Sequence, residues 1–199
     1  SLALLYALSG LRKFYPKKFD IVALTVNLGF ENQDFNLIKD FCKNLDVECK
    51  IIDTEIGDIV FHKRKESNPC SLCAKMRKGS INDVAKKMGC NKVAYAHHRD
   101  DMIETMLMSL IYEGRFHCFN PVTYLDRMGL NVIRPMMYVP EMDVIGFANK
   151  YNLPVAKNPC PVDGHTKREY IKTLVRQLNR ENPNCKDRLF TAVLNGGFD

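Results

Sequence analysis

Residues 92–112, KVAYAHHRDDMIETMLMSLIY, show the pattern that decides the fold. The first five residues, 92–96, predict a short strand. They lead directly into a segment that predicts a helix over about residues 102–112, where Asp101 and Glu104 have the spacing of a capping box. The stretch therefore predicts a strand that is followed at once by a helix.

The same alternation continues through the rest of the chain. We expect further strands over residues 20–27, 47–53, 131–137 and 153–156. We expect further helices over residues 2–14, 34–45, 81–88 and 140–151, and a basic helix that starts near Thr166. Long loops are expected over residues 55–68 and 113–128. Strands that alternate with helices form a parallel sheet with helices on both faces, which predicts an α/β protein.

The composition indicates a globular protein of 199 residues, 46% hydrophobic and 26% charged. No apolar run approaches the roughly 18 residues that a membrane span requires, and nothing is typical of a secretory signal. We therefore expect a cytoplasmic protein without a membrane partner. In that reducing compartment the eight cysteines are more typical of free thiols or metal ligands than of a disulfide framework.

The net charge of +6 is concentrated in clusters of Lys and Arg, one of which lies in the predicted basic helix. Such clusters suit a polyanion, because each neutralised phosphate releases counterions, although a solvated surface would have the same composition. We expect two parts, an α/β domain over residues 1–160 and a basic helical extension over residues 161–199.

Three cysteines share an unusual setting. Cys70 and Cys73 form a C-x-x-C pair, and both Cys70 and Cys160 follow an Asn-Pro dipeptide. Because proline fixes its own φ and keeps its predecessor extended, we expect both segments to be stiff loops rather than helices. If the two loops lie at the same edge of the sheet, the three thiols form one site.

The spacing alone leaves the nature of that site open. A structural zinc ion would need a fourth ligand, for which the candidates are His97, His98 and His165. An iron–sulfur cluster held by three thiolates would leave one iron open to an external ligand. The cysteines could also be ordinary, unrelated thiols.

Further polar residues lie where the predicted strands end, and ligands of open parallel sheets bind beyond these carboxyl ends. Asn27 ends one strand, and Asp100 and Asp101 follow another. These carboxylates could hold Mg²⁺ or a ribose, and His97 and His98 could meet a phosphate or a base. Alternatively, Asp101 caps the helix and the histidines are partly buried.

Arg77 follows Cys73 by one helical turn. In that position it could bind a phosphate beside the thiols and would lower the thiol pKa. The alternative is an ordinary solvated side chain on a helix face.

The motifs PCSLCAKMRKG, AHHRDDMIETMLMSLIYEG, VIRPM and NPCP occur in this order. Together they resemble the tRNA 2-thiocytidine biosynthesis family of the N-type ATP pyrophosphatase (PP-loop) superfamily, over nearly the whole chain. The resemblance implies an adenine nucleotide α-hydrolase-like fold. It also implies an enzyme that activates the C2 carbonyl of a cytidine in the tRNA anticodon loop with ATP and Mg²⁺, and then replaces the oxygen by sulfur.

The resemblance also implies roles for particular residues. Cys70, Cys73 and Cys160 would hold a [4Fe–4S] cluster, Asp100 and Asp101 would hold Mg²⁺ or orient the activated base, and Arg77 would steady phosphate charge. The residues expected to contact the nucleotide are Ser1, Asn27, His97 and His98. The expected partners are tRNA, a sulfur donor such as a cysteine desulfurase system, and a second copy of the chain.

One feature departs from the superfamily pattern. Its pyrophosphate loop, S-G-G-x-D-S, would immediately precede residues 2–8, and only its last serine is represented, by Ser1. We expect the rest of the loop to precede Ser1. Two other functions remain open: a PP-loop enzyme that thiolates a different tRNA nucleoside, and a non-catalytic RNA-binding module with a structural zinc ion or cluster.

Overall fold

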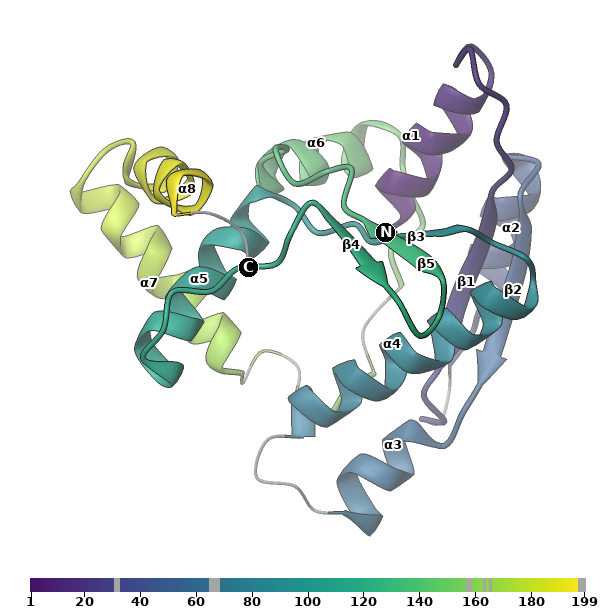
Figure 1. Ribbon diagram of the computed structural model, residues 1–199, viewed down its shortest axis with the longest axis horizontal. Coiled ribbons are helices and arrows are strands. Elements are labelled where there is room, and N and C mark those ends of the chain that lie inside the picture. The colour runs from purple at the N-terminus through teal and green to yellow at the C-terminus, as the bar shows by residue number, and fades with distance from the viewer. Residues whose placement is uncertain (31–32, 65–68, 157–158, 163, 165, 197–199) are drawn as a thin grey trace. The chain divides into compact units, whose positions relative to one another are not determined.

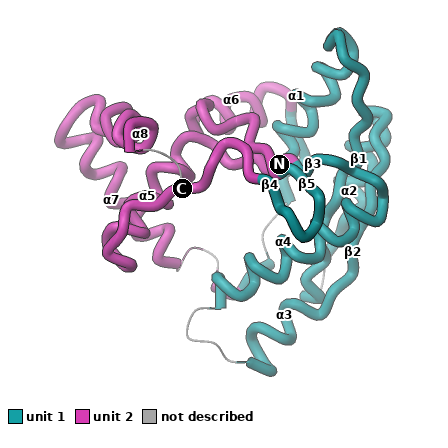
Figure 2. Tube along the Cα trace, in the orientation of Figure 1, with its two compact units in different colours: residues 1–93, 124–131, 152–160 teal, residues 94–123, 132–151, 161–199 magenta. Residues whose placement is uncertain are grey.

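The computed structural model describes residues 1–199 except 31–32, 65–68, 157–158, 163, 165 and 197–199. Helices and strands alternate along most of the chain (Figure 1). The chain divides into two compact units (Figure 2). Unit 1 comprises Ser1–Val93, Tyr124–Asn131 and Asn152–Cys160, and unit 2 comprises Ala94–Thr123, Val132–Tyr151 and Pro161–Asp199.

A parallel pair of strands organises unit 1. Strands β1 (Val22–Asn27) and β2 (Glu48–Asp53) pair so that Asn27 lies opposite Asp53 at their carboxyl ends. The helices of this unit include α1 (Leu2–Arg12), α2 (Asn36–Asn44) and α4 (Pro69–Lys87). Helix α2 contacts β2, and α4 contacts β1. These elements confirm the strand and helix alternation predicted for the first half of the chain.

Part of the loop predicted over residues 55–68 is helical. Helix α3 (Ile56–Asp58) continues into a π-helical segment, η1 (Ile59–Lys63). Ile56 and Val60 are almost completely buried, and the Gly57 amide donates a 2.8 Å hydrogen bond to the Leu28 carbonyl. Tertiary burial therefore stabilises a short helix here that the local pattern did not predict.

The prediction that Cys70 and Cys73 lie in a stiff loop is wrong, because α4 already begins at Pro69. Proline is well suited to the first position of a helix, where its missing amide hydrogen is not needed. The two cysteines thus lie in the first turns of α4, with Cys73 three residues after Cys70. Cys160 lies in irregular structure, as predicted.

A second sheet has the strand order β3-β5-β4, from β3 (Lys92–Ala94), β4 (Val122–Leu125) and β5 (Leu130–Ile133). Bonds from the Asn131 amide to the Asn91 carbonyl and from the Tyr95 amide to the Ile133 carbonyl advance in the same direction along β3 and β5, as in a parallel pair.

Two expectations about strands are wrong. Strand β4 lies in the stretch expected to be a loop, because the turn at residues 126–129 returns the chain as a hairpin, with Gly129 at φ +65°. The described residues 153–156 form no strand. There the Val155 amide donates to the nearby Leu153 carbonyl at 2.8 Å, so that this amide is not available to a neighbouring strand.

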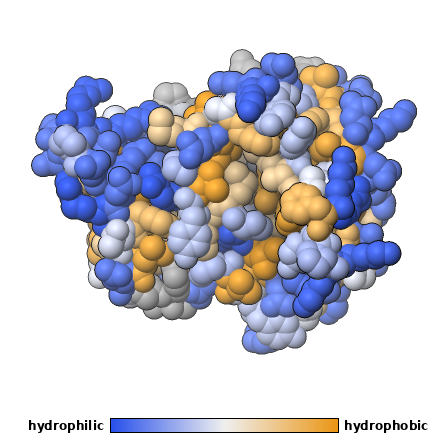
Figure 3. All heavy atoms as spheres, turned by 90° about the horizontal axis from the view of Figure 1, so that it is seen from above, coloured by the Kyte–Doolittle hydropathy of each residue, from blue (hydrophilic) through white to orange (hydrophobic). Residues whose placement is uncertain are grey.

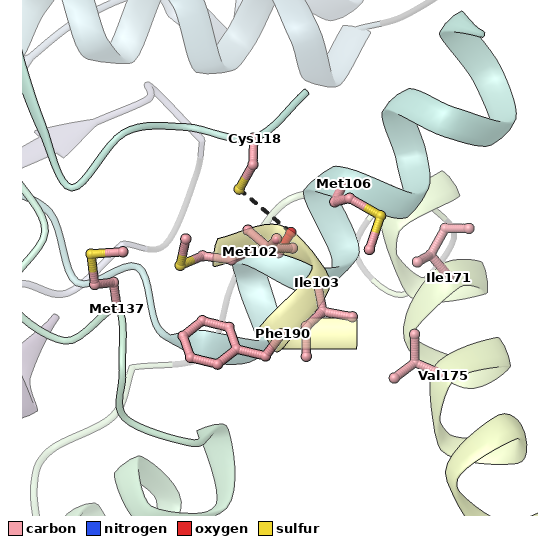
Figure 4. Packing of buried hydrophobic residues seen from close by; sticks show 9 residues of the cluster. Met102, Ile103, Met106, Cys118, Met137, Ile171, Val175 and Phe190 are labelled. Carbon is pink, nitrogen blue, oxygen red and sulfur yellow. Dashed lines mark hydrogen bonds between the residues drawn. The ribbon is translucent and has the colours of Figure 1, made fainter. Parts of the chain in front are cut away.

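Unit 2 is built on helix α5 (Arg99–Glu113), with α6 (Glu141–Lys150), α7 (Lys167–Glu181) and α8 (Cys185–Asn195). Nine buried side chains form its core (Figure 4): Met102, Ile103, Met106, Cys118, Met137, Ile171, Val175, Phe190 and Val193. The residues from α7 and α8 pack directly on α5. The compact units therefore differ from the expected division at residue 160, since the C-terminal helices share a core with α5.

Among the described helices, none combines the length and the apolar composition that crossing a bilayer requires.

Candidate functional site

The carboxyl ends of β1 and β2 are joined by polar contacts. The Asn27 side-chain amide donates to Asp53 Oδ1 at 2.9 Å, and Asn27 Oδ1 accepts from the Gly29 amide at 3.0 Å. Thr54 Oγ1 donates to the Asn27 carbonyl at 2.7 Å. Gly29 has a φ of +80°, and a Cβ at this position would lie 2.9 Å from the Thr54 carbonyl oxygen. Asn27 thus lies at the end of its strand, as predicted, in a closely packed loop.

The start of α4 packs beside this loop. Cys73 is one of the partly buried residues that contact a cluster formed by Leu28, Ile56 and Val60. Leu28 directly follows β1, so the cluster ties the C-x-x-C helix to the carboxyl end of that strand. Cys70 lies one turn earlier on α4 and is exposed.

The three predicted thiols influence one another electrostatically. Burial raises the pKa of Cys70, and the electrostatic influence of Cys160 raises it further. Burial also raises the pKa of Cys73; the Arg77 charge opposes this effect, whereas Cys160 and Cys70 add to it. The thiols therefore belong to one group within unit 1, and their mutual repulsion as thiolates would be relieved by a bound cation.

The chemistry of the donor set suits a thiolate-bound metal group, because Cys70, Cys73 and Cys160 are free thiols and the pKa of Cys73 is raised by both of the others. In the described part of the chain, however, no three His, Cys, Asp or Glu side chains already have an arrangement that could hold a metal ion. His165, the third candidate for a zinc ligand, lies outside the described residues.

The start of α5 in unit 2 is fixed by a capping box. His98 is the N-cap, its Nδ1 accepts from the Asp101 amide at 3.3 Å, and Asp101 Oδ2 accepts from the His98 amide at 2.9 Å. The predicted capping box between Asp101 and Glu104 is therefore wrong. The helix begins one turn earlier than that box requires, and the His98 imidazole acts as the capping acceptor. The ring of His97 packs against that of Phe119, with 4.7 Å between the ring centres.

Asp100 is held from two other helices. Its side chain is almost completely buried, Oδ1 accepts from Lys186 Nζ at 2.6 Å, and Oδ2 accepts from the Glu141 amide at 2.7 Å. Burial alone would raise the pKa of Asp100, but the hydrogen bonds from Lys186 and Glu141 and the charges of Lys186 and His98 hold the pKa below its ordinary value. Asp100 therefore joins α5 to α6 and α8.

Glu104 is a second buried carboxylate on α5, and Arg168 of α7 pairs with it at 2.9 Å. Burial raises the pKa of Glu104, although Arg168 opposes the shift. The same guanidinium donates to Thr105 Oγ1 at 3.1 Å and lies 3.6 Å from Asp101 Oδ1. Asp101 is the more accessible aspartate, with 22% of its side chain exposed against 6% for Asp100.

The sequence did not reveal the partners of these carboxylates. Lys186 and Glu141 are 86 and 41 residues away from Asp100, and Arg168 is 64 residues away from Glu104. Arg168 could be noted only as a member of a basic cluster, and Lys186 had no local signal.

The predicted site residues are divided between the units. Unit 1 contains Ser1, Asn27, Cys70, Cys73, Arg77 and Cys160, and unit 2 contains His97, His98, Asp100 and Asp101. Ser1 is the N-cap of α1, and its carbonyl accepts from the Leu5 amide at 3.0 Å. Arg77 is exposed on α4.

Comparison with known families decides the relationship. The PP-loop domain family matches residues 1–179. The chain belongs to the PP-loop family. It is 35% identical to a tRNA-cytidine(32) 2-sulfurtransferase of Geobacter sulfurreducens over 98% of this chain and 77% of the relative. A tRNA-cytidine(32) 2-sulfurtransferase of Citrifermentans bemidjiense is 33% identical, over 98% of this chain and 78% of the relative.

A solved PP-loop structure supports the fold. The U34-tRNA thiolase NcsA from Methanococcus maripaludis, solved with its [4Fe–4S] cluster, superimposes with a TM-score of 0.79 at 24% identity. The match covers 98% of this chain and 67% of that structure. The expected α/β fold with a parallel sheet and the expected superfamily are both confirmed.

Proposed function

We propose that this PP-loop protein is an ATP-dependent tRNA-cytidine sulfurtransferase. It activates the C2 carbonyl of a cytidine in the anticodon loop and replaces the oxygen by sulfur. The names of the curated relatives support the substrate and the reaction. The observation that carries the proposal within this chain is the electrostatic coupling of Cys70, Cys73 and Cys160 in the unit that also contains the ends of β1 and β2.

The first half-reaction prepares the carbonyl oxygen to leave. The oxygen attacks the α-phosphorus of ATP, pyrophosphate departs, and the base becomes linked to AMP through that oxygen. Ser1, Asn27, His97 and His98 are the residues proposed to contact the nucleotide. The rigid loop around Asn27 supports this role, because its position is fixed before a ligand binds.

The two aspartates have different proposed roles. Both oxygens of Asp100 are bound by protein groups, which supports a positioning role for this residue. The Asp101 side chain is more exposed than that of Asp100, which supports it as the carboxylate for Mg²⁺ or for the activated base, with Arg168 3.6 Å from its Oδ1. Arg77, exposed one turn after Cys73, is placed to balance phosphate charge.

The second half-reaction replaces oxygen by sulfur. Sulfide adds to C2, the C–O bond breaks, and AMP leaves with the former carbonyl oxygen. Cys70, Cys73 and Cys160 would hold a [4Fe–4S] cluster, which when bound supplies an iron with a position for an external sulfur ligand. Burial raises the pKa of Cys73, and the Arg77 charge opposes that rise and so favours the thiolate, which is the form that binds metal.

Three further parts of the proposal concern the surroundings of the enzyme. Its sulfur comes from a donor such as a cysteine desulfurase system, its location is cytoplasmic, and its assembly is a homodimer.

The substitution Cys160→Ala tests the proposed function. Loss of one of three thiolates should abolish 2-thiocytidine formation while leaving the fold intact, because Cys160 lies in irregular structure. Nucleoside mass spectrometry of tRNA from cells that carry only the variant measures the product. Cys90→Ala, a partly buried thiol outside the group, is the matched control and should retain activity.

Metal and nucleoside analysis separate the alternatives. Anaerobically prepared protein should contain iron and sulfide, and the Cys160→Ala protein should contain less of both. Bound zinc without iron, together with intact thiocytidine in a deletion strain, would instead identify a non-catalytic RNA-binding module. If the deletion strain instead lacks a different thiolated nucleoside, the enzyme thiolates that nucleoside and not cytidine.

A further inference from the structure

Helix α7 carries five basic residues, and the structure divides them into two sets. Arg168 and Lys172 form ion pairs with Glu104 and Glu141, respectively, and so neutralise carboxylates of their own unit. The second set consists of Lys167, Arg176 and Arg180. This division means that the positive charge of the second set is available to a partner.

The second set lies on the solvent side of the helix. Residues 167, 170, 173, 176, 177 and 180 are all exposed, and apart from the adjacent pair 176 and 177 they follow one another at intervals of three, so that they occupy the solvent-facing half of the helix. Within the described part of the chain, no carboxylate lies within ion-pair distance of Arg176 or Arg180. Glu181, at the end of the helix, accepts a hydrogen bond from Gln177 at 2.9 Å. The face therefore has a net positive charge.

Exposed aromatic rings accompany this charge. Tyr170 is 60% exposed on the same face, and Tyr112, at the end of α5, is 41% exposed. Lys167 Nζ lies 4.5 Å from the centre of the Tyr112 ring. Lysine and arginine neutralise phosphates, and exposed aromatic rings stack on unpaired bases, so the combination is suited to RNA with single-stranded segments.

We propose that this face of unit 2 is an RNA-docking surface. We define the α7 docking face by Lys167, Tyr170, Arg176, Arg180 and Tyr112. Hydrophilic residues predominate on the side of Figure 3 that carries α7 and α8. Residues 167 to 180 extend over about 20 Å of helix, long enough to follow several phosphates. The inference rests on the proposed function, because the RNA that it assigns to this face is the substrate tRNA.

A pair of charge reversals tests the α7 docking face. Arg176→Glu with Arg180→Glu should raise the Kd for an unmodified tRNA transcript about tenfold or more and reduce the slope of log K against log salt by about 1 to 2. The matched control is Lys39→Glu with Lys43→Glu on α2. These lysines are also exposed, also four residues apart, and change the net charge equally. Fluorescence anisotropy between about 50 and 200 mM salt measures both.

A substitution at Tyr170 tests the stacking contribution. Tyr170→Ala should weaken tRNA binding about fivefold or more, whereas Tyr170→Phe, which keeps the ring, should bind within about twofold of the wild type. Because Tyr170 is exposed, the circular dichroism and thermal unfolding of both variants should match those of the unmodified chain. Equal affinities of the Ala and Phe variants would overturn the role of Tyr170 in the docking face.

Other outcomes of these measurements distinguish binding by the α7 docking face from binding by overall net charge. Equal losses in the α7 and α2 double variants would mean that only net charge matters, which overturns the docking face. If the wild type binds duplex DNA of equal length as tightly as tRNA, the surface is a general polyanion surface, which also overturns the docking face.

The remaining outcomes separate the docking face from the proposed function. If the α7 double variant binds and thiolates tRNA normally, the α7 docking face is wrong but the proposed function stands. If the wild type binds tRNA through the α7 docking face but forms no thiocytidine, the proposed function is wrong and the docking face stands.

Discussion

Asp100 and Asp101 are adjacent, yet their surroundings give them different chemistry. Asp100 accepts hydrogen bonds from Lys186 and the Glu141 amide, whereas Asp101 caps its own helix and has the more exposed side chain. A sequence motif that contains two aspartates therefore combines one residue that organises the unit with another that is available to a ligand.

The substitution Asp100→Asn should lower the free energy of unfolding by about 3 kcal/mol at neutral pH, because Lys186 would lose its anionic partner. The effect should depend on pH with a defined sign. Since the folded-state pKa of Asp100 is held below its ordinary value, its stabilising contribution is complete above the unfolded-state pKa of about 4 and is lost as the pH falls through the folded-state pKa.

Urea unfolding at several pH values measures this contribution. The difference between wild type and Asp100→Asn should be constant from about pH 5 to 8 and should shrink below about pH 4. A difference of the same size at pH 3 and pH 7 would show that the Asp100 carboxylate is not the source of the stability.

Helix α4 shows which element boundaries a sequence can reveal. Its end was predicted at residue 88, just before Gly89, and the structure has the hydrogen bonds of a Schellman motif there, from Gly89 N to the Lys86 carbonyl and from Cys90 N to the Ala85 carbonyl, both at 3.0 Å. Its start was not predicted, because the proline before Cys70 was interpreted as a loop residue although it occupies the first helical position.

The two glycines of this segment should respond oppositely to the same substitution. Gly89 has a φ of +74°, so Gly89→Ala should lower the free energy of unfolding by about 1 to 2 kcal/mol. Gly79 lies inside α4 with nothing within 4 Å of an added Cβ, so Gly79→Ala should raise stability by up to about 1 kcal/mol. Thermal and urea unfolding measure both changes. Shifts of the same sign would contradict this assignment of the helix end.

At the scale of the whole chain, residues far apart in sequence form each compact unit. Unit 2 gathers three separate segments around α5, and Ile171 of α7 is fully buried in its core. Ile171→Ala should therefore destabilise unit 2 by about 2 to 5 kcal/mol. If the units open separately, this loss is confined to unit 2.

Hydrogen exchange measures that separation. In the Ile171→Ala protein, amides of α5 and α7 should exchange about 100-fold faster, whereas amides of β1 and β2 should keep their protection. Thr173→Ala, an exposed position on the same helix, is the control and should change neither unit. Equal acceleration in both units would show that the chain opens as one cooperative body.

The features of this chain that could be predicted from its sequence are those that depend on neighbouring residues. The strand that ends at Asn27 and the Thr166 cap of α7, which accepts from the Glu169 amide at 3.3 Å, follow from local patterns. The pairing of Lys186 with Asp100 and the helix at Ile56 depend on contacts made only after folding. The metal-site residues stay predictions, supported by the coupling among the thiols.

The core of unit 2 contains sulfur in four of its nine side chains, Met102, Met106, Cys118 and Met137. Thioethers are readily oxidised to polar sulfoxides, and a sulfoxide in this position would disrupt the packing. Because these methionines are at most 3% exposed, peroxide can reach them only when the unit opens. The rate of methionine oxidation in unit 2 is therefore set by how often the unit opens, and the amount of sulfoxide formed at Met102 would report how much opening has occurred.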